Sequence, residues 1–393
     1  MRALEGIRVI DFSRILAGPF ATMILADMGA EVIKIERPVK GDDSRAYGPF
    51  VEGESLYFMS VNRGKKSIEV NLKNPKALEF ILKLIDSADV LVENFKPGVM
   101  EKLGLGYETL KIRNPRLIYC ACSGYGQTGP YAHKPAYDMI MQGLSGIMSI
   151  TGPDSDHPTR VGMSIADVDT GMFAALGILT ALYQREKTGR GQLVDIAMFD
   201  CMMSILENAA TRTMNTGKAP TAIGNRHVTI CPFCSIRASD GFFNIAAGND
   251  ELFVRLAEAL EAPEMASDPR YATNDLRIQN WPSLEKDLND AAGKRTIAEW
   301  CERLDKAGVP AGPIHTLKEA CAHPQLEARQ TLVTIPHPVA GDVRCVASPL
   351  HLSDSAPAYT ASPVLGADSV QFIREIFGCD AAEAQELAAS MKA

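Results

Sequence analysis

The chain has 393 residues, of which 46% are hydrophobic and 22% are charged, the composition of a soluble globular protein. This length exceeds one simple core and predicts two or three domains. The formal net charge of −8 argues against a nucleic-acid partner, because nucleic-acid binding requires a basic face. We find no apolar run of the roughly 20 residues that a membrane helix needs, and no secretory signal at the N-terminus. Composition therefore predicts a cytoplasmic protein with no membrane partner.

The nine cysteines are scattered along the chain and form no disulfide framework, which indicates a reducing compartment. The only close pairs are Cys120 with Cys122 and Cys231 with Cys234. A zinc site would need a second such pair or spaced histidines, and the seven histidines show no metal spacing. The sequence therefore predicts buried structural thiols and no metal site.

The first 125 residues alternate between short, β-branched strands and helices. Gly18-Pro19 suits the start of the first helix and Gly29 its end. This alternation predicts an α/β fold with a doubly wound parallel sheet. Strands are predicted over residues 8–12, 30–36, 67–72, 89–94 and 116–123, and further helices over 75–87 and 100–112.

The helical pattern extends beyond residue 125, and the chain changes character at about residues 226–325. Residues 136–186 are mostly helical, and 191–198 have the pattern of a further strand. A hairpin and short amphipathic helices then predict a smaller α+β domain. The hairpin spans 233–246, helices follow over 250–260, 282–292 and 296–307, an extended stretch spans 333–352, and two helices span 368–377 and 381–391.

We expect a large domain built from both ends of the chain. Its parts are residues 1–200 and 351–393, and the small domain is 226–325. Residues 201–225 and 326–350 are predicted to be linkers.

The turn after the first strand excludes the most familiar use of such a fold. It reads Ser13-Arg14-Ile15-Leu16-Ala17-Gly18-Pro19, without the Gly-x-Gly-x-x-Gly that lets backbone approach a dinucleotide. The chain also has no Gly-Lys-Ser/Thr phosphate loop and no Gly-x-Ser-x-Gly nucleophile elbow. Hydride transfer and serine hydrolysis are therefore disfavoured.

Asp167 is the most informative residue, because it precedes an uncharged run, 172–183, that predicts a buried helix. A carboxylate at the start of a helix can cap it, or can act as a nucleophile that the helix-end amides keep ionised. Asp169 is the nearest competing nucleophile. The residues alone leave these roles open.

Several motifs, in a fixed order over essentially the whole chain, resemble the class III CoA-transferases of the CaiB–BaiF superfamily. This resemblance implies a Rossmann-like large domain, an interlocked homodimer and active sites at the subunit interface. The motifs are Leu16–Pro19, Gly29–Pro38, Asn62–Ile68, Val92–Gly98, Gly124–Pro130, Gly162–Met172, Lys187–Gln192, Ala307–Pro313 and Pro363–Gly366.

The resemblance implies an acyl-CoA:carboxylate CoA-transferase in which Asp167 is the nucleophile. The aspartate attacks the thioester to give a mixed anhydride, and CoA thiolate converts this into an aspartyl-CoA thioester. CoA is a substrate, so no permanently bound cofactor is implied. The match assigns Asp138 a supporting role and favours Asp167 over Asp169, because two residues separate the family's acid from its Thr/Ser/Ala-Gly pair.

The resemblance also implies the residues that contact CoA. Lys102 stands where the formyl-CoA branch has arginine, so the charge is kept but the bidentate fork is lost. The implied contacts are Leu16, Ala17, Arg37, Val70, Asn71, Leu72, Lys73, Asn94, Phe95, Lys96, Lys102 and Tyr137.

Tyr137 distinguishes between activities within the superfamily. The similar α-methylacyl-CoA racemases have a histidine base at this position, and a phenol with a pKa near 10 is a poor base at neutral pH. A 2-methylacyl-CoA racemase is therefore the alternative to CoA transfer. A non-catalytic CoA-binding paralogue is the second alternative.

Two features bear on the substrate. The long glycine-rich loop of the formyl-CoA branch is missing near residues 227–234, which argues against oxalate–formate exchange. Gly248-Asn249-Asp250 resembles branches that use succinyl-CoA with small dicarboxylic acids. A second substrate carboxylate would need a cation, and the candidates are Arg45, Arg160, Arg226 and His227.

Overall fold

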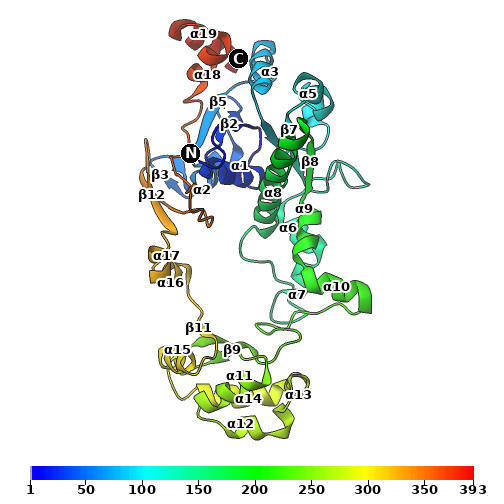
Figure 1. The fold of residues 1–393 in the computed structure, drawn as a ribbon, viewed down its shortest axis with the longest axis vertical. Coiled ribbons are helices and arrows are strands. Elements are labelled where there is room, and N and C mark those ends of the chain that lie inside the picture. The colour runs from blue at the N-terminus through cyan, green and yellow to red at the C-terminus, as the bar shows by residue number, and fades with distance from the viewer. Residues whose placement is uncertain (1) are drawn as a thin grey trace. The chain divides into compact units, whose positions relative to one another are not determined.

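The computed structural model describes residues 2–393 and divides into two compact units, which are described separately (Figure 1). The first unit contains the chain up to Ile147, together with Val161–Thr211 and Gln325–Ala393. The second unit contains Met148–Arg160 and Arg212–Pro324.

A six-stranded parallel sheet forms the centre of the first unit, which confirms the predicted sheet. In the order β5-β2-β1-β6-β7-β8, strands are added on one side of β1 and then on the other. This doubly wound order has its switch point between β1 and β6, where Ile10 pairs with Leu91. The strands are β1 (Arg8–Asp11), β2 (Glu31–Glu36), β5 (Lys65–Glu69), β6 (Val90–Glu93), β7 (Ile118–Ser123) and β8 (Leu193–Ala197).

Helices cover both faces of the sheet. Successive strand residues point to opposite faces, so Val9 and Val32 belong to one apolar core and Ile10 and Ile33 to another. Such strands, buried on both faces, are typical of parallel sheets. The Val9 face is covered by α1 (Ala17–Asp27) and α8 (Ile165–Thr188), and the Ile10 face by α3 (Pro75–Asp86), α18 (Ser369–Phe377) and α19 (Ala381–Lys392).

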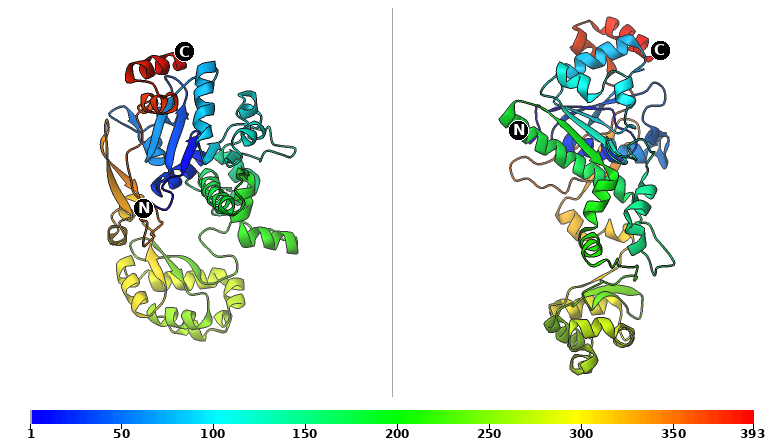
Figure 2. Two further views of the ribbon diagram at one scale, coloured as in Figure 1. Left: turned by 45° about the horizontal axis from the view of Figure 1, so that its top comes forward. Right: turned by 90° about the vertical axis from the view of Figure 1, so that its right-hand side faces the viewer.

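The C-terminal helices return to the N-terminal part of the sheet. Figures 1 and 2 show α18 and α19, in red, beside α3, and both contact it. The backbone N–H of Asn71 donates to the carbonyl of Met391 at 2.8 Å, and its side chain donates to the carbonyl of Ala393 at 2.9 Å. The last turn of α19 therefore supports the loop that follows β5.

Some predicted elements differ from the structure. The helix predicted over 100–112 is broken into α4 (Val99–Lys102) and α5 (Tyr107–Arg113), because Gly104 has a φ of +74°. The predicted linkers also contain regular structure, since α9 (Met198–Ile205) and α10 (Glu207–Thr216) occupy much of 201–225.

The remaining elements are short. They are η1 (Asp43–Ala46), β3 (Phe50–Val51), β4 (Glu54–Ser55), α2 (Leu56–Asn62), α6 (Asp138–Ser145), α7 (Ile147–Ile150), α16 (Leu317–Ala320), α17 (Pro324–Ala328), β12 (Leu332–His337) and β13 (Gly341–Val346).

Helix α8 is 24 residues long and, by length and composition alone, is apolar enough to cross a membrane. No continuous apolar run of that length marks this helix in the sequence. Half of its most apolar 18-residue stretch is buried within the protein. Gly171 allows α8 to approach α1 closely, because a Cβ there would lie 2.7 Å from the carbonyl oxygen of Ala17. The start of α8 is thereby held beside the start of α1.

The second unit packs helices on a three-stranded antiparallel sheet whose core includes Phe243, Leu256 and Trp300. Cys231 and Cys234 belong to this core, and burial raises the pKa of their thiols to about 11 and about 12. The elements are β9 (Phe233–Arg237), β10 (Phe242–Ala246), α11 (Asp250–Ala259), α12 (Glu264–Ser267), η2 (Pro269–Tyr271), α13 (Asn274–Gln279), α14 (Trp281–Ala292), α15 (Ile297–Lys306) and β11 (Ala311–Pro313).

Candidate functional site

The carboxyl ends of β1 and β6 lead into two turns at the switch point of the sheet, where ligands of doubly wound folds bind. Two cavities of about 240 Å³ each open on these turns. The first, here called the β2 cleft, is lined by residues 34–38, 41–42 and 70–73. The second, the Asp167 cavity, is lined by residues 14–17, 94–97, 134–137 and Asp167. Arg14 and Phe95 line both cavities, so the two adjoin.

The turn after β1 is held in a strained conformation. Ile15 has a φ of +68°, which β-branched residues rarely adopt. The backbone N–H of Ile15 donates to a carboxylate oxygen of Asp42 at 3.0 Å. The side-chain amide of Asn94 bonds to both the N–H and the carbonyl of Arg14, each at 2.8 Å. Side chains from both neighbouring loops therefore fix this turn at the junction of the cavities.

A buried ion pair supports the same turn. The ammonium of Lys34 lies 2.8 Å from Asp42 and donates to the carbonyl of Ser13 at 2.7 Å. Burial opposes the ionisation of Asp42, but Lys34 and backbone donors hold the pKa of this carboxyl well below its usual range. Removing one partner of such a pair would leave an uncompensated buried charge, so the pair holds the turn in place.

Asp167 is the third residue of α8 and faces the second cavity. Burial, and then the nearby charge of Asp138, raise the pKa of Asp167 to about 7. Among the described residues, we find no hydrogen-bond donor to its carboxylate. Asp167 therefore titrates near neutral pH, and no hydrogen bond from these residues holds its carboxylate oxygens.

Asp138, not Asp167, provides the cap of α8. One carboxylate oxygen of Asp138 accepts the backbone N–H of Ala166 at 3.0 Å, and the other accepts the side-chain N–H of Gln142 at 2.8 Å. This capping bond reaches from the start of α6 to the start of α8. The expectation that helix-end amides keep Asp167 ionised is therefore wrong, because the Ala166 amide is bonded to Asp138 and the pKa of Asp167 is raised.

Asp169 lies on another side of α8. Residues two positions apart in an α-helix are separated by about 200° around the helix axis. Asp169 is buried, does not line the Asp167 cavity, and has one carboxylate oxygen with no hydrogen-bond partner among the described residues. Burial raises its pKa. The structure thus gives Asp167, and not Asp169, access to a ligand.

The predicted CoA contacts divide between the two cavities. Lys102 is an exception, because it is exposed on α4 and lines neither cavity. The residues in the β2 cleft are Arg37, Val70, Asn71, Leu72, Lys73 and Phe95, and those in the Asp167 cavity are Leu16, Ala17, Asn94, Phe95, Lys96 and Tyr137.

Arg14 is a site residue that the sequence analysis missed. Its guanidinium lies 4.9 Å from the centre of the Phe95 ring and 3.0 Å from Asp43, which also pairs with Arg37. The Nε of Arg14 is buried and has no hydrogen-bond partner among the described residues. A cation in the first strand-to-helix turn of a doubly wound fold was the available signal. Lys134, in the Asp167 cavity, was missed as well.

The four cations proposed for a second substrate carboxylate do not line the Asp167 cavity. Arg45 is bound to both carboxylate oxygens of Glu36 at 2.7 Å and lies 3.7 Å from the centre of the Phe58 ring. Arg160, Arg226 and His227 belong to the second unit. In the part of the chain that the structure describes, no group of three His, Cys, Asp or Glu residues could hold a metal ion.

Proteins with known activities are similar in sequence to this chain. A model of the CoA-transferase family III matches residues 4–369. An acetyl-CoA:oxalate CoA-transferase of Acetobacter aceti is 49% identical over 330 residues, covering 84% of this chain and 85% of that protein. A succinyl-CoA:glutarate CoA-transferase of Mus musculus is 38% identical over 396 residues, covering 99% of this chain and 90% of that protein.

A solved structure shares the fold. A CAIB/BAIF family protein from Brucella suis has a TM-score of 0.87 and 40% identity, covering 95% of this chain and 99% of that chain. The six-stranded parallel sheet and these relatives together define an enzyme that transfers CoA. The chain belongs to the CoA-transferase family III, as its motifs predicted.

Proposed function

We propose that this CoA-transferase works through covalent catalysis by Asp167. A carboxylate oxygen of Asp167 attacks the carbonyl carbon of an acyl-CoA, the C–S bond breaks, and CoA leaves as a thiolate. The thiolate then attacks the aspartyl carbonyl of the mixed anhydride and releases the donor acid. The acceptor carboxylate then attacks the aspartyl-CoA thioester, which gives a second mixed anhydride and CoA thiolate. The thiolate attacks the acceptor's carbonyl carbon, so the acceptor leaves as a CoA thioester and the Asp167 carboxylate is regenerated.

The environment of Asp167 carries this proposal. A carboxylate attacks as its anion, and a pKa of about 7 leaves enough anion at neutral pH while making it more basic than an ordinary aspartate. Because Asp138 caps α8, Asp167 has no structural bond to break before it reacts.

We propose that CoA lies across both cavities. The β2 cleft combines apolar walls, including Leu72, with the cations of Arg37 and Lys73, and suits an adenine and its phosphates. The Asp167 cavity then receives the pantetheine arm and the thioester. Arg14 lies where the cavities adjoin, so it would contact the diphosphate that links the nucleotide to pantetheine.

The acceptor that we propose is a small dicarboxylic acid. The two curated relatives described above are named for oxalate and glutarate, and both are dicarboxylic acids. The sequence argued against oxalate–formate exchange, but the A. aceti relative pairs oxalate with acetyl-CoA, so oxalate remains a candidate acceptor. Succinyl-CoA and acetyl-CoA are the donors to test first.

We also propose a homodimer. One face of α8 exposes Met172, Leu176, Leu179 and Tyr183, at the spacing of a single helical stripe. Contiguous exposed apolar surface of this kind marks interaction sites. A second copy of the chain is the partner that the family resemblance implies.

The proposed function is tested by steady-state transfer from succinyl-CoA to glutarate. We expect double-displacement kinetics, and we expect Asp167→Asn to lower kcat by at least a thousandfold. Asp169→Asn is the matched control, because Asp169 lies outside the cavity, and it should retain transfer activity. Substantial transfer by Asp167→Asn would refute the proposal.

A further inference from the structure

The proposed transfer to dicarboxylic acids leaves one group without a partner. The first carboxylate of the acceptor reacts at Asp167, and the second is a charge that must be carried into a partly buried cavity. Isolated charges are costly to desolvate, so a site of this kind needs a cation. The inference below rests on the proposed function.

Three cations line the Asp167 cavity, and Asp167 is the only acid among its lining residues. Arg14 also lines the β2 cleft and is paired with Asp43, so it lies at the nucleotide side. Lys96 directly follows Phe95, which is likewise shared by both cavities. Lys134 lines the Asp167 cavity alone, within the same segment as Tyr137.

The ammonium of Lys134 is held without being neutralised. It lies 3.6 Å from the centre of the Tyr131 ring, a cation–π contact. Tyr131 is itself packed edge-on against Tyr125, with ring centres 5.7 Å apart. Among the described residues, we find no carboxylate paired with the Lys134 ammonium. The contact with the ring thus leaves N–H donors on the other side of the ammonium for a ligand.

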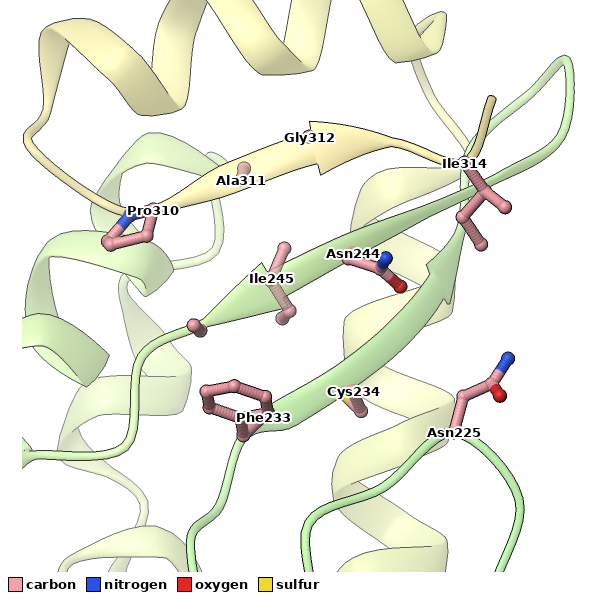
Figure 3. Close-up of a pocket in the computed structure, with 10 residues that line it drawn as sticks. Asn225, Phe233, Cys234, Asn244, Ile245, Pro310, Ala311, Gly312 and Ile314 are labelled. Atoms are coloured by element: carbon pink, nitrogen blue, oxygen red, sulfur yellow. The ribbon is translucent and has the colours of Figure 1, made fainter. Parts of the chain in front are cut away.

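Another cavity, of about 580 Å³, lies on the sheet of the second unit. Figure 3 shows the residues that line it. Its lining includes Phe233, Asn244 and Ile314 but contains no charged side chain. This cavity therefore lacks a partner for a carboxylate. Among the cavities with a cation, the Asp167 cavity also contains the reacting carboxylate.

We propose that Lys134 binds the second carboxylate of the dicarboxylic substrate and thereby selects dicarboxylic over monocarboxylic acids. The ammonium and carboxylate form a charge-assisted hydrogen bond. Since donor and acceptor occupy the same cavity in turn, Lys134 also binds the free carboxylate of a succinyl-CoA donor.

The test compares glutarate with pentanoate, which has the same chain length but lacks the second carboxylate. In a double-displacement reaction, kcat/KM for the acceptor reports only the second half-reaction, so the two acceptors are compared with succinyl-CoA as the common donor. We expect Lys134→Gln to lower kcat/KM for glutarate by about tenfold, near the lower end for a charged hydrogen bond because the lysine is exposed. The value for pentanoate should change less than twofold, and Lys134→Arg should restore part of the preference.

Two matched variants separate this role from others. Lys111→Gln removes a lysine that also lies over a tyrosine ring, Tyr107, but lies outside both cavities, and it should alter neither acceptor. Lys96→Gln should raise KM for acyl-CoA and leave the ratio between glutarate and pentanoate unchanged.

The outcomes distinguish failure of this inference from failure of the proposed function. No transfer by the wild-type enzyme from succinyl-CoA, acetyl-CoA or butyryl-CoA to any acid would overturn the proposed function. Wild-type transfer without a preference for glutarate would overturn the role of Lys134. The same role would be overturned if Lys134→Gln lowered kcat/KM equally for glutarate and pentanoate. It would also be overturned if Lys134→Gln raised KM equally for succinyl-CoA and butyryl-CoA, because that result would indicate the loss of a contact with CoA itself.

Discussion

Two acids at the site, the buried Asp42 and the partly buried Asp167, show how the environment of a residue sets its charge. Burial raises the pKa of Asp42 and of Asp167 alike, but Asp42 also faces Lys34 and two backbone donors, and its pKa falls far below the usual range. Asp167 has only the repulsion of Asp138 added to burial, and its pKa rises to about 7. The first carboxylate is thus permanently charged and structural. The second is the one that we propose as the nucleophile.

Catalysis should therefore depend on the ionisation of Asp167. We expect kcat/KM for acyl-CoA to fall as the pH is lowered through about 7, because protonation removes the nucleophilic anion. Asp138→Asn removes a negative charge, so it should lower the pKa of Asp167. The acidic limb of the pH profile, where kcat/KM falls, should then move to lower pH. The measurement is the pH profile of kcat/KM for wild type and variant.

Asparagine at position 138 keeps an oxygen that can accept the Ala166 N–H, so α8 should remain capped. Asp138→Ala, which loses the cap as well as the charge, provides the comparison for structural damage. A limb that stays in place or moves to higher pH in Asp138→Asn would contradict the assigned cause of the shift.

At the level of elements, Asp167 is positioned by the contact between α1 and α8. A Cβ on Gly171 would meet the backbone oxygen of Ala17, and a backbone atom cannot move aside without moving its helix. We expect Gly171→Ala to cost about 1–3 kcal/mol in the free energy of unfolding and to lower kcat/KM, because overpacking displaces α8 from α1. Denaturant unfolding and steady-state assays measure both effects.

Gly162→Ala is the control for that substitution, because no atom lies within 4 Å of a Cβ at Gly162. It should leave stability and activity nearly unchanged. Equal effects of the two substitutions would show that glycine flexibility, rather than close packing, matters in this segment.

A separate prediction concerns Arg14, which lies in the turn between β1 and α1. If Arg14 binds the diphosphate of CoA, Arg14→Gln should lower kcat/KM for succinyl-CoA by about tenfold or more, the effect of losing a charged hydrogen bond. The loss should be equally large with succinyl-dephospho-CoA and absent with succinyl-pantetheine, which has no diphosphate. A loss that persists with succinyl-pantetheine would instead indicate damage to the turn.

The sequence predicted the core elements well because burial on both faces leaves a clear pattern. The strands β1, β2 and β6 lie within a residue of their predicted bounds. The hairpin 50–55 and helix α2 were missed, because elements this short carry too few residues for periodicity to detect. The helix predicted over 100–112 failed at Gly104, since an apolar pattern does not reveal a left-handed residue.

The candidate site was partly accessible from sequence. Motifs singled out Asp167, but the capping of α8 by Asp138 depends on a hydrogen bond to Ala166, 28 residues further along the chain. Arg45 looked like an available cation, yet it is bound to Glu36, nine residues earlier. Pairings of this kind arise only from the fold, so sequence could propose the charged residues without saying which are already neutralised.

At the scale of the whole molecule, the switch point of the sheet gathers the site from distant segments. The turns after β1 and β6 meet the start of α8, and the C-terminal helix supports the loop after β5. Because both chain ends build this unit, loss of α19 should weaken the β2 cleft as well as the fold.

The proposed homodimer makes a prediction of its own. Leu176→Glu places a charge within the apolar stripe of α8, so it should shift the protein from dimer to monomer in sedimentation equilibrium. Ile112→Glu introduces the same charge at an exposed apolar residue of α5, outside the stripe, and should leave the dimer intact. A monomeric wild-type protein, or a Leu176→Glu variant that remains fully dimeric, would contradict the proposed interface.

The most direct test of covalent catalysis is mass spectrometry of the enzyme after mixing with succinyl-CoA in the absence of an acceptor. We predict a CoA adduct that maps to the peptide containing Asp167, that is present in Asp169→Asn and absent in Asp167→Asn, and that disappears when glutarate is added. An adduct on another residue, or full transfer activity with no acyl or CoA adduct on Asp167, would contradict the account.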